Sequence, residues 1–246
     1  MNPIVSIVIA TYNSGKTLEK ALDSVINQEF QSWECIVVDG LSNDDSINIV
    51  RSFVSRDKRI KFISEKDNGI YDAFNKGWKL AKGEWIYYLG SDDRLTKDSF
   101  VKMGELIKNC SSNIAVISGQ IIRHSRLGRE KIEPSQGFYG SHQAKITRRS
   151  VLEAMHGFDE KYKILADYDL YIRMEKAGYR ALNIDAIIAH FYAGGTSESI
   201  KNLREISKER LALMIADPNE EHPFYTNTIM TVKDLIAIIV SKIINK

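Results

Sequence analysis

Short apolar runs alternate with amphipathic segments through the first hundred residues. Four of the runs predict strands buried on both faces, at residues 4–10, 35–38, 60–64 and 85–89. Between them, apolar positions at helical spacing predict helices that start at Thr17 and cover 45–54 and 71–81. Because strand and helix alternate, we expect an α/β fold whose parallel strands are joined by right-handed crossovers.

The second half of the chain has a less regular pattern. Strands are predicted at 115–122, at 144–147 and within 179–190, and helices at 150–156 and 167–177. A basic loop is expected over 123–131. A length of 246 residues suits one α/β domain, which we place at 1–215, followed by a helical tail at 216–246.

Polar residues follow each of the four N-terminal strands. They are Thr11 to Asn13, Asp39, Asp67 to Gly69, and Asp92 with Asp93. Any one of these segments alone is well explained as a solvated turn. Because the carboxyl ends of parallel strands meet at one edge, where open α/β sheets bind ligands, the four together predict a ligand site.

Charge and cysteine content narrow the classes of function. The 34 basic and 32 acidic residues give a net charge of +2, which is too balanced for a general nucleic-acid binder. Cys35 and Cys110 lack the spacing of a zinc site or a disulfide framework. The N-terminal residues lack a signal-peptide pattern, and no window has the ~18 apolar residues of a membrane span. We therefore expect a cytoplasmic protein.

The carboxylates at the strand ends suggest how phosphate groups are bound. Adjacent Asp92 and Asp93 repel each other unless a cation or hydrogen bonds offset their charge. Magnesium binds through one or two carboxylates plus substrate phosphates. The alternative is that they cap the helix expected near Asp98. Asp39 is placed either to accept a hydrogen bond from an imide such as uracil or to bind a ribose hydroxyl, and its alternative is a turn before Gly40.

Four residues of the second half are further candidates. Asp167 and Asp169 lie at a predicted helix start, where one would cap the helix and the other would act as general base. His190 ends an apolar run before a Gly-Gly loop, which leaves a structural role and a metal or diphosphate contact both open. His142, beside Gln143, is a weaker candidate for contacting the acceptor or the diphosphate.

Four motifs, in this order and spacing, resemble those of family 2 glycosyltransferases. They are Pro3 to Asn13, Val37 to Asp44, Asp67 to Gly77, and Gly83 to Asp93. The resemblance extends over residues 3 to 195. It implies the GT-A fold, a Rossmann-like, mostly parallel central sheet flanked by helices, here with a C-terminal helical extension. It also implies transfer of a sugar from a nucleotide-sugar with inversion at the anomeric carbon.

The resemblance implies a nucleotide site at the ends of the first three strands. Thr11, Tyr12 and Asn13 would line the nucleotide pocket, and Asp39 would hold the base. Asp67 and Lys76 would lie in the segment that closes over the nucleotide. UDP is the preferred nucleotide, with GDP and dTDP as alternatives, and the sequence does not specify the sugar, the acceptor or the linkage.

The resemblance also implies a metal site and a base. Asp93 would ligate a divalent metal, Mn²⁺ or Mg²⁺, and Asp92 would contact the ribose or the sugar. His190 is a further candidate ligand from its own position before the Gly-Gly loop. Asp167 is expected to be the base, with Asp169 as the fallback. The chain departs from the family pattern at Ser91, in place of the first Asp of Asp-x-Asp, and at Ala166, in place of a Glu before the base.

Residues 229–244 form an apolar helix candidate that is interrupted by Lys233, Asp234 and Lys242. Two interpretations stay open: the helix lies in a membrane interface, or it packs on the domain or on a second subunit of a homodimer. The resembling family often builds bacterial surface polysaccharides on lipid-diphosphate carriers. The expected acceptor is therefore a saccharide, with a lipid-linked one as the leading candidate, reached by peripheral contact with the cytoplasmic face of the membrane.

Two other functions are compatible with an α/β sheet that carries these residues. A nucleotidyltransferase that makes a nucleotide-sugar would need a Gly-rich basic loop after the first strand, but Thr11 to Lys16 contains one Gly and one Lys. A non-catalytic nucleotide- or carbohydrate-binding module is compatible with the fold alone. The candidates for both a metal ligand and a base argue against such a module.

Overall fold

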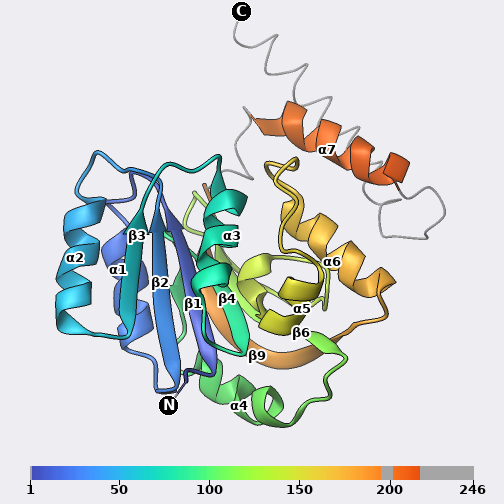
Figure 1. Cartoon of the computed structure of the whole chain (residues 1–246), viewed down its shortest axis with the longest axis horizontal. Helices are drawn as coiled ribbons and strands as arrows, with labels where there is room; N and C mark the ends of the chain where they lie inside the picture. Colours follow the sequence, from blue (N-terminus) through green and yellow to red (C-terminus); the bar gives the residue numbers. More distant parts are fainter. Residues whose placement is uncertain (1, 195–201, 217–246) are drawn as a thin grey trace, which may run out of the picture.

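The computed structural model describes residues 2–194 and 202–216, which form one mixed sheet with helices on both faces (Figure 1). The strand order is β3-β2-β1-β4-β8-β6-β9-β5, and β7 pairs with β6. The strands are β1 Val5–Thr11, β2 Trp33–Asp39, β3 Ile60–Ser64, β4 Trp85–Gly90, β5 Arg94–Leu95, β6 Ile114–His124, β7 Glu130–Glu133, β8 Lys145–Arg148 and β9 Arg180–Tyr192. The helices are α1 Leu18–Ile26, α2 Ser46–Arg56, α3 Ile70–Leu80, α4 Ser99–Asn109, η1 His142–Ala144, α5 Arg149–Ala154, α6 Ala166–Lys176 and α7 Leu203–Ala216.

The first four strands are parallel, as the alternating pattern predicts. The register places Thr11 beside Asp39 and Ala10 beside Gly90, so β1, β2 and β4 end at the same level. Strand β3 extends the parallel set, with Ser64 opposite Asp39. The polar segments that follow these strands therefore share one edge of the sheet.

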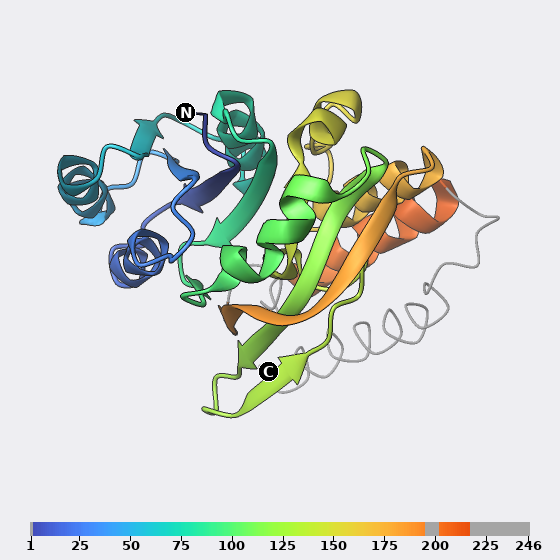
Figure 2. The same cartoon turned by 90° about the horizontal axis from the view of Figure 1, so that it is seen from below.

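Beyond β4 the sheet is mixed. Strand β8 is antiparallel to both β4 and β6, whereas β6 and β9 are parallel with register shifts near Gln120. The expected loop over 123–131 is instead largely a hairpin, because His124 pairs with Glu130 and Arg123 forms an ion pair with Glu133 (Figure 2). Cross-strand charge pairs let basic residues occupy an exposed strand.

Two apolar clusters, one on each face of the sheet, form the core. The period of two in β1 sends Ile7 and Ile9 to one cluster and Val8 to the other. Helices α1, α2 and α4 pack on the first cluster, and α3, α5, α6 and α7 on the second. Cys35 is fully buried in the first cluster.

Helix α3 approaches β1 closely because residue 77 is glycine. A Cβ at Gly77 would lie 2.2 Å from Cγ1 of Val8, well inside van der Waals contact. This close packing fixes the helix that follows Asp67 to Gly69 against the strand that leads to Thr11. Two segments of the predicted ligand edge are thereby held together.

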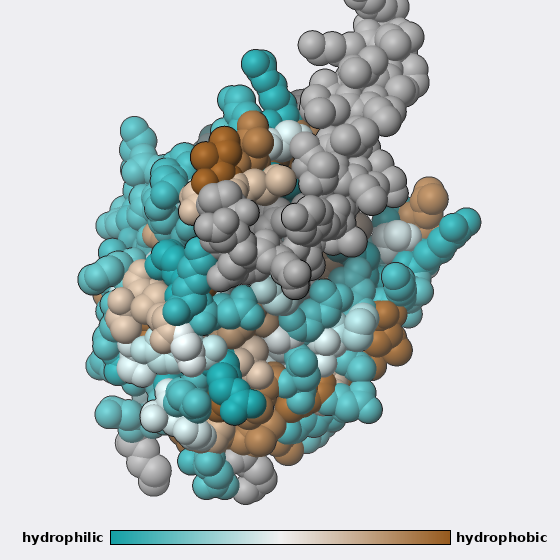
Figure 3. All heavy atoms as spheres, turned by 90° about the vertical axis from the view of Figure 1, so that its right-hand side faces the viewer, coloured by the Kyte–Doolittle hydropathy of each residue, from teal (hydrophilic) through white to brown (hydrophobic). Residues whose placement is uncertain are grey.

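The structure tests the expectations for the C-terminal part of the chain only up to residue 216. The tail at 229–244 lies outside the described residues, and the division at 215 stays a prediction. None of the helices in the described ranges is long and apolar enough to cross a membrane. Figure 3 shows the α6 and α7 side of the molecule, where the coloured surface is largely hydrophilic with separate apolar patches.

Candidate active site

Buried polar atoms without partners mark the ends of β1 and β2. Asp39 is 1% exposed, and its Oδ2 accepts hydrogen bonds from Ser42 N at 3.1 Å and Ser64 Oγ at 2.7 Å. Its Oδ1 has no partner, and neither has Oγ1 of the neighbouring Thr11. Unsatisfied buried polar atoms are costly, so their occurrence side by side points to a ligand that hydrogen-bonds to them.

Asp67 joins this pair from the loop before α3. A Cβ at Gly40 would lie 2.4 Å from Asp67 Oδ2, so the carboxylate packs directly on the backbone that follows Asp39. The other oxygen of Asp67 accepts a hydrogen bond from Gly69 N at 3.0 Å. The structure therefore brings Thr11, Asp39 and Asp67 together, as the strand-end argument predicts.

Three other residues predicted to bind nucleotide have different surroundings. Asn13 has a positive φ of 52° and accepts a hydrogen bond from Asn43 N at 2.9 Å, which holds the loop after β2. Tyr12 is 63% exposed, which leaves its ring accessible. Lys76 forms ion pairs with Glu65 at 3.1 Å and Asp72 at 3.4 Å. A role for Lys76 at the nucleotide would require it to exchange these partners.

Asp92 and Asp93 approach each other beside Gly90. A Cβ at Gly90 would lie 2.5 Å from Asp93 Oδ2 and 3.0 Å from Asp92 Oδ1, so only glycine leaves room for both carboxylates. Burial raises the pKa of Asp93 to about 6, and the charge of Asp92 adds to the shift. Burial likewise raises the pKa of Asp92. A bound cation would offset the charge of these two carboxylates and so favour their ionised forms.

This pair fits a divalent metal that takes its remaining ligands from phosphate and water. Among the described residues, no three His, Cys, Asp or Glu side chains form a metal-binding group, so His190 does not complete a set with Asp92 and Asp93. Mg²⁺ sites commonly use one or two carboxylates with substrate phosphates. His190 instead contacts another histidine, because its Nδ1 lies 2.9 Å from Nε2 of His124. The ring of Tyr192 stacks on the ring of His124.

Asp167 lies at the start of α6, where several polar groups meet it. Its Oδ1 lies 2.9 Å from the Tyr71 hydroxyl and accepts a hydrogen bond from Tyr168 N at 2.9 Å. Its Oδ2 lies 3.5 Å from Nδ1 of His142. Burial alone would raise the pKa of Asp167, but His142, the charge of Lys145 and Tyr71 outweigh it and lower that pKa. Asp167 is thus ionised near neutral pH.

Helix η1 connects the two acidic centres. His142 contacts Asp167, while the next residue, Gln143, donates a hydrogen bond from Nε2 to Asp93 Oδ2 at 3.1 Å. The second oxygen of Asp93 accepts a hydrogen bond from Tyr192 N at 2.9 Å. Two adjacent residues therefore contact Asp93 and Asp167, which places both carboxylates beside one short turn.

The side chain of Asp169 takes part in contacts that hold helix α6 in place. It forms an ion pair with Arg173 one turn later at 2.8 Å, and Arg173 also donates hydrogen bonds to Met155 O and Gly157 O. These contacts tie α6 to the end of α5. The side chains of Asp167 and Asp169 therefore have separate partners, although the two residues share the first turn of α6.

Sequence reasoning did not identify two side chains near Asp167. Tyr71 is 6% exposed and reads as a core position of an amphipathic helix. Lys145 is 1% exposed, and its Nζ donates hydrogen bonds to Gly140 O at 2.7 Å and Ser141 O at 3.2 Å. Burial lowers the pKa of Lys145 to about 7. The lysine inside the strand predicted at 144–147 was the available signal for a buried cation.

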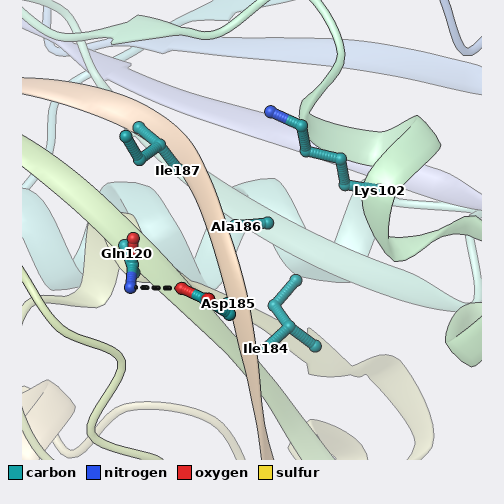
Figure 4. Close-up of a pocket in the computed structure, with 6 residues that line it drawn as sticks. All are labelled: Lys102, Gln120, Ile184, Asp185, Ala186 and Ile187. Atoms are coloured by element: carbon teal, nitrogen blue, oxygen red, sulfur yellow. Dashed lines mark hydrogen bonds between the residues drawn. The ribbon is translucent and has the colours of Figure 1, made fainter.

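A hollow in the described part of the structure lies outside this cluster. It has a volume of about 440 Å³ and is lined by Lys102 of α4, Gln120 of β6 and residues 184–187 of β9 (Figure 4). Gln120 Nε2 donates a hydrogen bond to Asp185 Oδ1 at 2.7 Å across it. It contains none of the predicted site residues.

Sequence relatives are glycosyltransferases. The chain is 32% identical over 177 residues to a PGL/p-HBAD biosynthesis glycosyltransferase of Mycobacterium tuberculosis, covering 70% of this chain and 69% of that protein. It is 30% identical over 219 residues to the chondroitin synthase of Escherichia coli. That match covers 84% of this chain but only 31% of the synthase.

Solved structures share the fold. The mannosyltransferase PcManGT from Pyrobaculum calidifontis, in complex with GDP-Man and Mn²⁺, superposes with a TM-score of 0.73 at 16% identity, over 97% of this chain and 72% of that one. TarS 1-349 of S. aureus, in complex with UDP, superposes with a TM-score of 0.65 at 20% identity, over 96% and 71%. The chain spans 40% of the longer TarS structure. These matches establish the GT-A fold.

The family assignment rests on the sequence itself. The model of the family described as Glycosyl transferase family 2 matches residues 6–170, which include the strand-end carboxylates and Asp167. Since this match takes in more than half of the 246 residues, the chain belongs to glycosyl transferase family 2.

Proposed function

We propose that the protein transfers a sugar, with inversion, from a nucleotide-diphosphate sugar to a hydroxyl group of a saccharide or lipid-linked acceptor. The observation that carries this proposal is the link through η1, in which Gln143 contacts Asp93 and His142 contacts Asp167. Asp93, suited to bind a metal that holds the diphosphate, and Asp167, suited to act as the base, thus contact the same turn. Family membership argues against the nucleotidyltransferase interpretation.

The donor would bind along the carboxyl ends of the parallel strands. The unpaired Asp39 Oδ1 is an acceptor suited to the imide N–H of uracil, which favours a UDP-sugar. Tyr12 is exposed enough to stack on the base. Relatives of this fold were solved with UDP and with GDP-Man, so the comparison leaves both nucleotides open.

Asp93, with Asp92 beside it, would hold Mn²⁺ or Mg²⁺ together with the diphosphate oxygens. The metal supplies positive charge that stabilises the leaving diphosphate. Gln143 and Tyr192 N each donate to Asp93 and so fix the orientation of its carboxylate. His190 would be a further ligand only after its ring leaves the contact with His124.

Asp167 would act as general base on the acceptor. It accepts the hydroxyl proton while that oxygen bonds to the anomeric carbon and the bond from this carbon to the diphosphate oxygen breaks. The lowered pKa of Asp167 keeps it deprotonated at neutral pH. Tyr71 and Tyr168 N contact Oδ1, whereas Oδ2 faces, among the described residues, only Nδ1 of His142 at 3.5 Å, so Oδ2 would receive the proton when the acceptor hydroxyl takes the place of that contact.

The test compares Asp167→Asn with Asp169→Asn, two residues apart on α6. A thermal-shift screen of UDP-, GDP- and dTDP-sugars with Mn²⁺ first identifies the donor. Nucleotide release is then measured with and without acceptor, and donor affinity by calorimetry. We expect Asp167→Asn to keep donor affinity and lose acceptor-dependent release, and Asp169→Asn to keep both. Full turnover in Asp167→Asn would refute the assignment, and absence of any nucleotide-sugar binding would favour a different function.

The acceptor and the location are proposals from wider similarity. One relative is named for PGL/p-HBAD biosynthesis and another is a chondroitin synthase, and the second name fits a saccharide acceptor. A lipid-linked acceptor would require peripheral contact with the cytoplasmic face of a membrane. Co-sedimentation of the full chain with anionic vesicles tests that contact, and gel filtration with light scattering tests for a homodimer.

A further inference from the structure

Helix α7 lies outside the residues that the family model matches. It packs beside α6, and Leu213 of α7 belongs to the same apolar cluster as Ala166 and Leu170 of α6 (Figure 1). The exposed residues Leu211 and Ile215 lie on its outer side. The helix is therefore docked on the element that carries Asp167, although nothing in the family match assigns it a role.

The inner side of α7 carries a buried carboxylate. Glu209 is 5% exposed, and its two oxygens accept hydrogen bonds from three successive backbone N–H groups, those of Lys163, Ile164 and Leu165. The distances are 3.1 Å to Ile164 N and 2.9 Å to Leu165 N. Charge-assisted hydrogen bonds of this kind are about twice as strong as neutral ones, so they offset the cost of burying the charge.

The segment held by Glu209 leads directly into Asp167. Leu165 immediately precedes α6, and Asp167 is its second residue. The Tyr71 hydroxyl also contacts this segment, because it lies 2.7 Å from Ile164 O and 2.9 Å from Asp167 Oδ1 and can donate its one proton to either oxygen. Residues 163–165 are thus held between Glu209 of α7 and Tyr71 of α3. The backbone position of Asp167 depends on both contacts.

We propose that Glu209 is a positioning residue for the base, which sets the place of Asp167 by holding residues 163–165 from α7. The inference rests on the proposed role of Asp167. Glu209 does not touch the substrate, and it acts through the backbone that precedes α6. A misplacement of about 1 Å at a reacting group lowers rates by roughly 100-fold, so loosening this segment reduces transfer much more than donor binding.

The experiment compares Glu209→Gln and Glu209→Ala with Glu205→Gln in the full chain. Glu205 lies on the same helix, is partly exposed and pairs with Lys208, so it controls for a changed charge on α7. Donor dissociation constants are measured by calorimetry with Mn²⁺, turnover by acceptor-dependent nucleotide release, and folding by thermal unfolding. We expect Glu209→Gln to lower kcat at least tenfold with the donor dissociation constant within twofold, and Glu205→Gln to change neither.

The outcomes separate positioning from a purely structural role. An unchanged kcat in folded Glu209→Gln would overturn the proposal, and so would a parallel loss of donor affinity and turnover. Failure of Glu209→Gln to fold would also overturn it, because it would assign Glu209 to the stability of the fold. Asp167→Asn, measured in the same assays, shows which proposal has failed. If Asp167→Asn retains turnover, the proposed base is wrong. If Asp167→Asn loses turnover and Glu209→Gln retains it, only the role of Glu209 is wrong.

Discussion

Replacing Asp93 by asparagine is expected to stabilise the metal-free protein at alkaline pH. Burial raises the pKa of Asp93 from 3.8 to about 6, so the folded state binds more protons than the unfolded chain between these values. Stability therefore falls as the pH rises from about 4 through 6. A difference of about 2 pKa units corresponds to about 3 kcal/mol, an upper value for the cost of ionising Asp93 in the fold.

Asparagine removes this cost but changes one contact. Its Oδ1 can still accept from Tyr192 N, whereas its amide nitrogen would face the donor Nε2 of Gln143, which costs about 1 kcal/mol. The net expectation for Asp93→Asn is a gain of about 2 kcal/mol above pH 7. At pH 4 the folded state keeps Asp93 protonated, whereas the unfolded chain is already more than half ionised. Most of the ionisation cost has then gone and the lost contact outweighs the rest, so we expect a small net loss, below about 1 kcal/mol. The difference from the wild type thus changes sign with pH.

Urea unfolding at pH 4, 6 and 8 in the presence of a chelator measures this difference. Asp159→Asn serves as a control of opposite sign, because the contact with Lys161 lowers the pKa of Asp159 against the effect of burial. That variant should be less stable than the wild type at pH 8 and approach it as the pH falls. A pH-independent difference for Asp93→Asn, or a loss at pH 8, would refute the reasoning. The same variant should lose the Mn²⁺-dependent part of UDP affinity.

Two further substitutions use the glycines that permit close approach. Gly40→Ala would place its Cβ 2.4 Å from Asp67 Oδ2, so we expect donor affinity to fall about tenfold. Calorimetry measures this affinity, and an unchanged value would contradict the packing of Asp67 at the nucleotide site. Gly77→Ala meets Val8 at 2.2 Å and should cost about 1–3 kcal/mol in urea unfolding. Gly104→Ala, in open space on α4, should instead gain about 0.5–1 kcal/mol, and equal effects at 77 and 104 would refute the close contact.

The N-terminal half could be predicted because its signals are local. The helix expected at 71–81 is α3 Ile70–Leu80, and the strand expected at 85–89 is β4 Trp85–Gly90. The spacing of hydrophobic residues and the turn residues within a short stretch of sequence determine such elements. The placement of Asp39 and Asp67 at one edge followed from the parallel topology alone.

The rest depends on contacts between distant segments. The pairing of β6 with β9 and the antiparallel insertion of β8 join strands far apart in the chain, and no local pattern encodes them. The position of Lys145 inside a predicted strand signals a buried cation, but its hydrogen-bond acceptors, Gly140 O and Ser141 O, cannot be predicted from that position. Glu209 resembles any acidic residue of a surface helix until residues 163–165 are placed against it.

A crystal structure of the protein with UDP and Mn²⁺ tests most directly whether the separate carboxylates surround one diphosphate. We predict an anomalous Mn²⁺ peak bound to Asp93 and to diphosphate oxygens, uracil hydrogen-bonded to Asp39 Oδ1, and Asp167 facing the side where the sugar would lie. Mn²⁺ or diphosphate bound away from Asp93, or uracil bound away from Asp39, would contradict the proposed site.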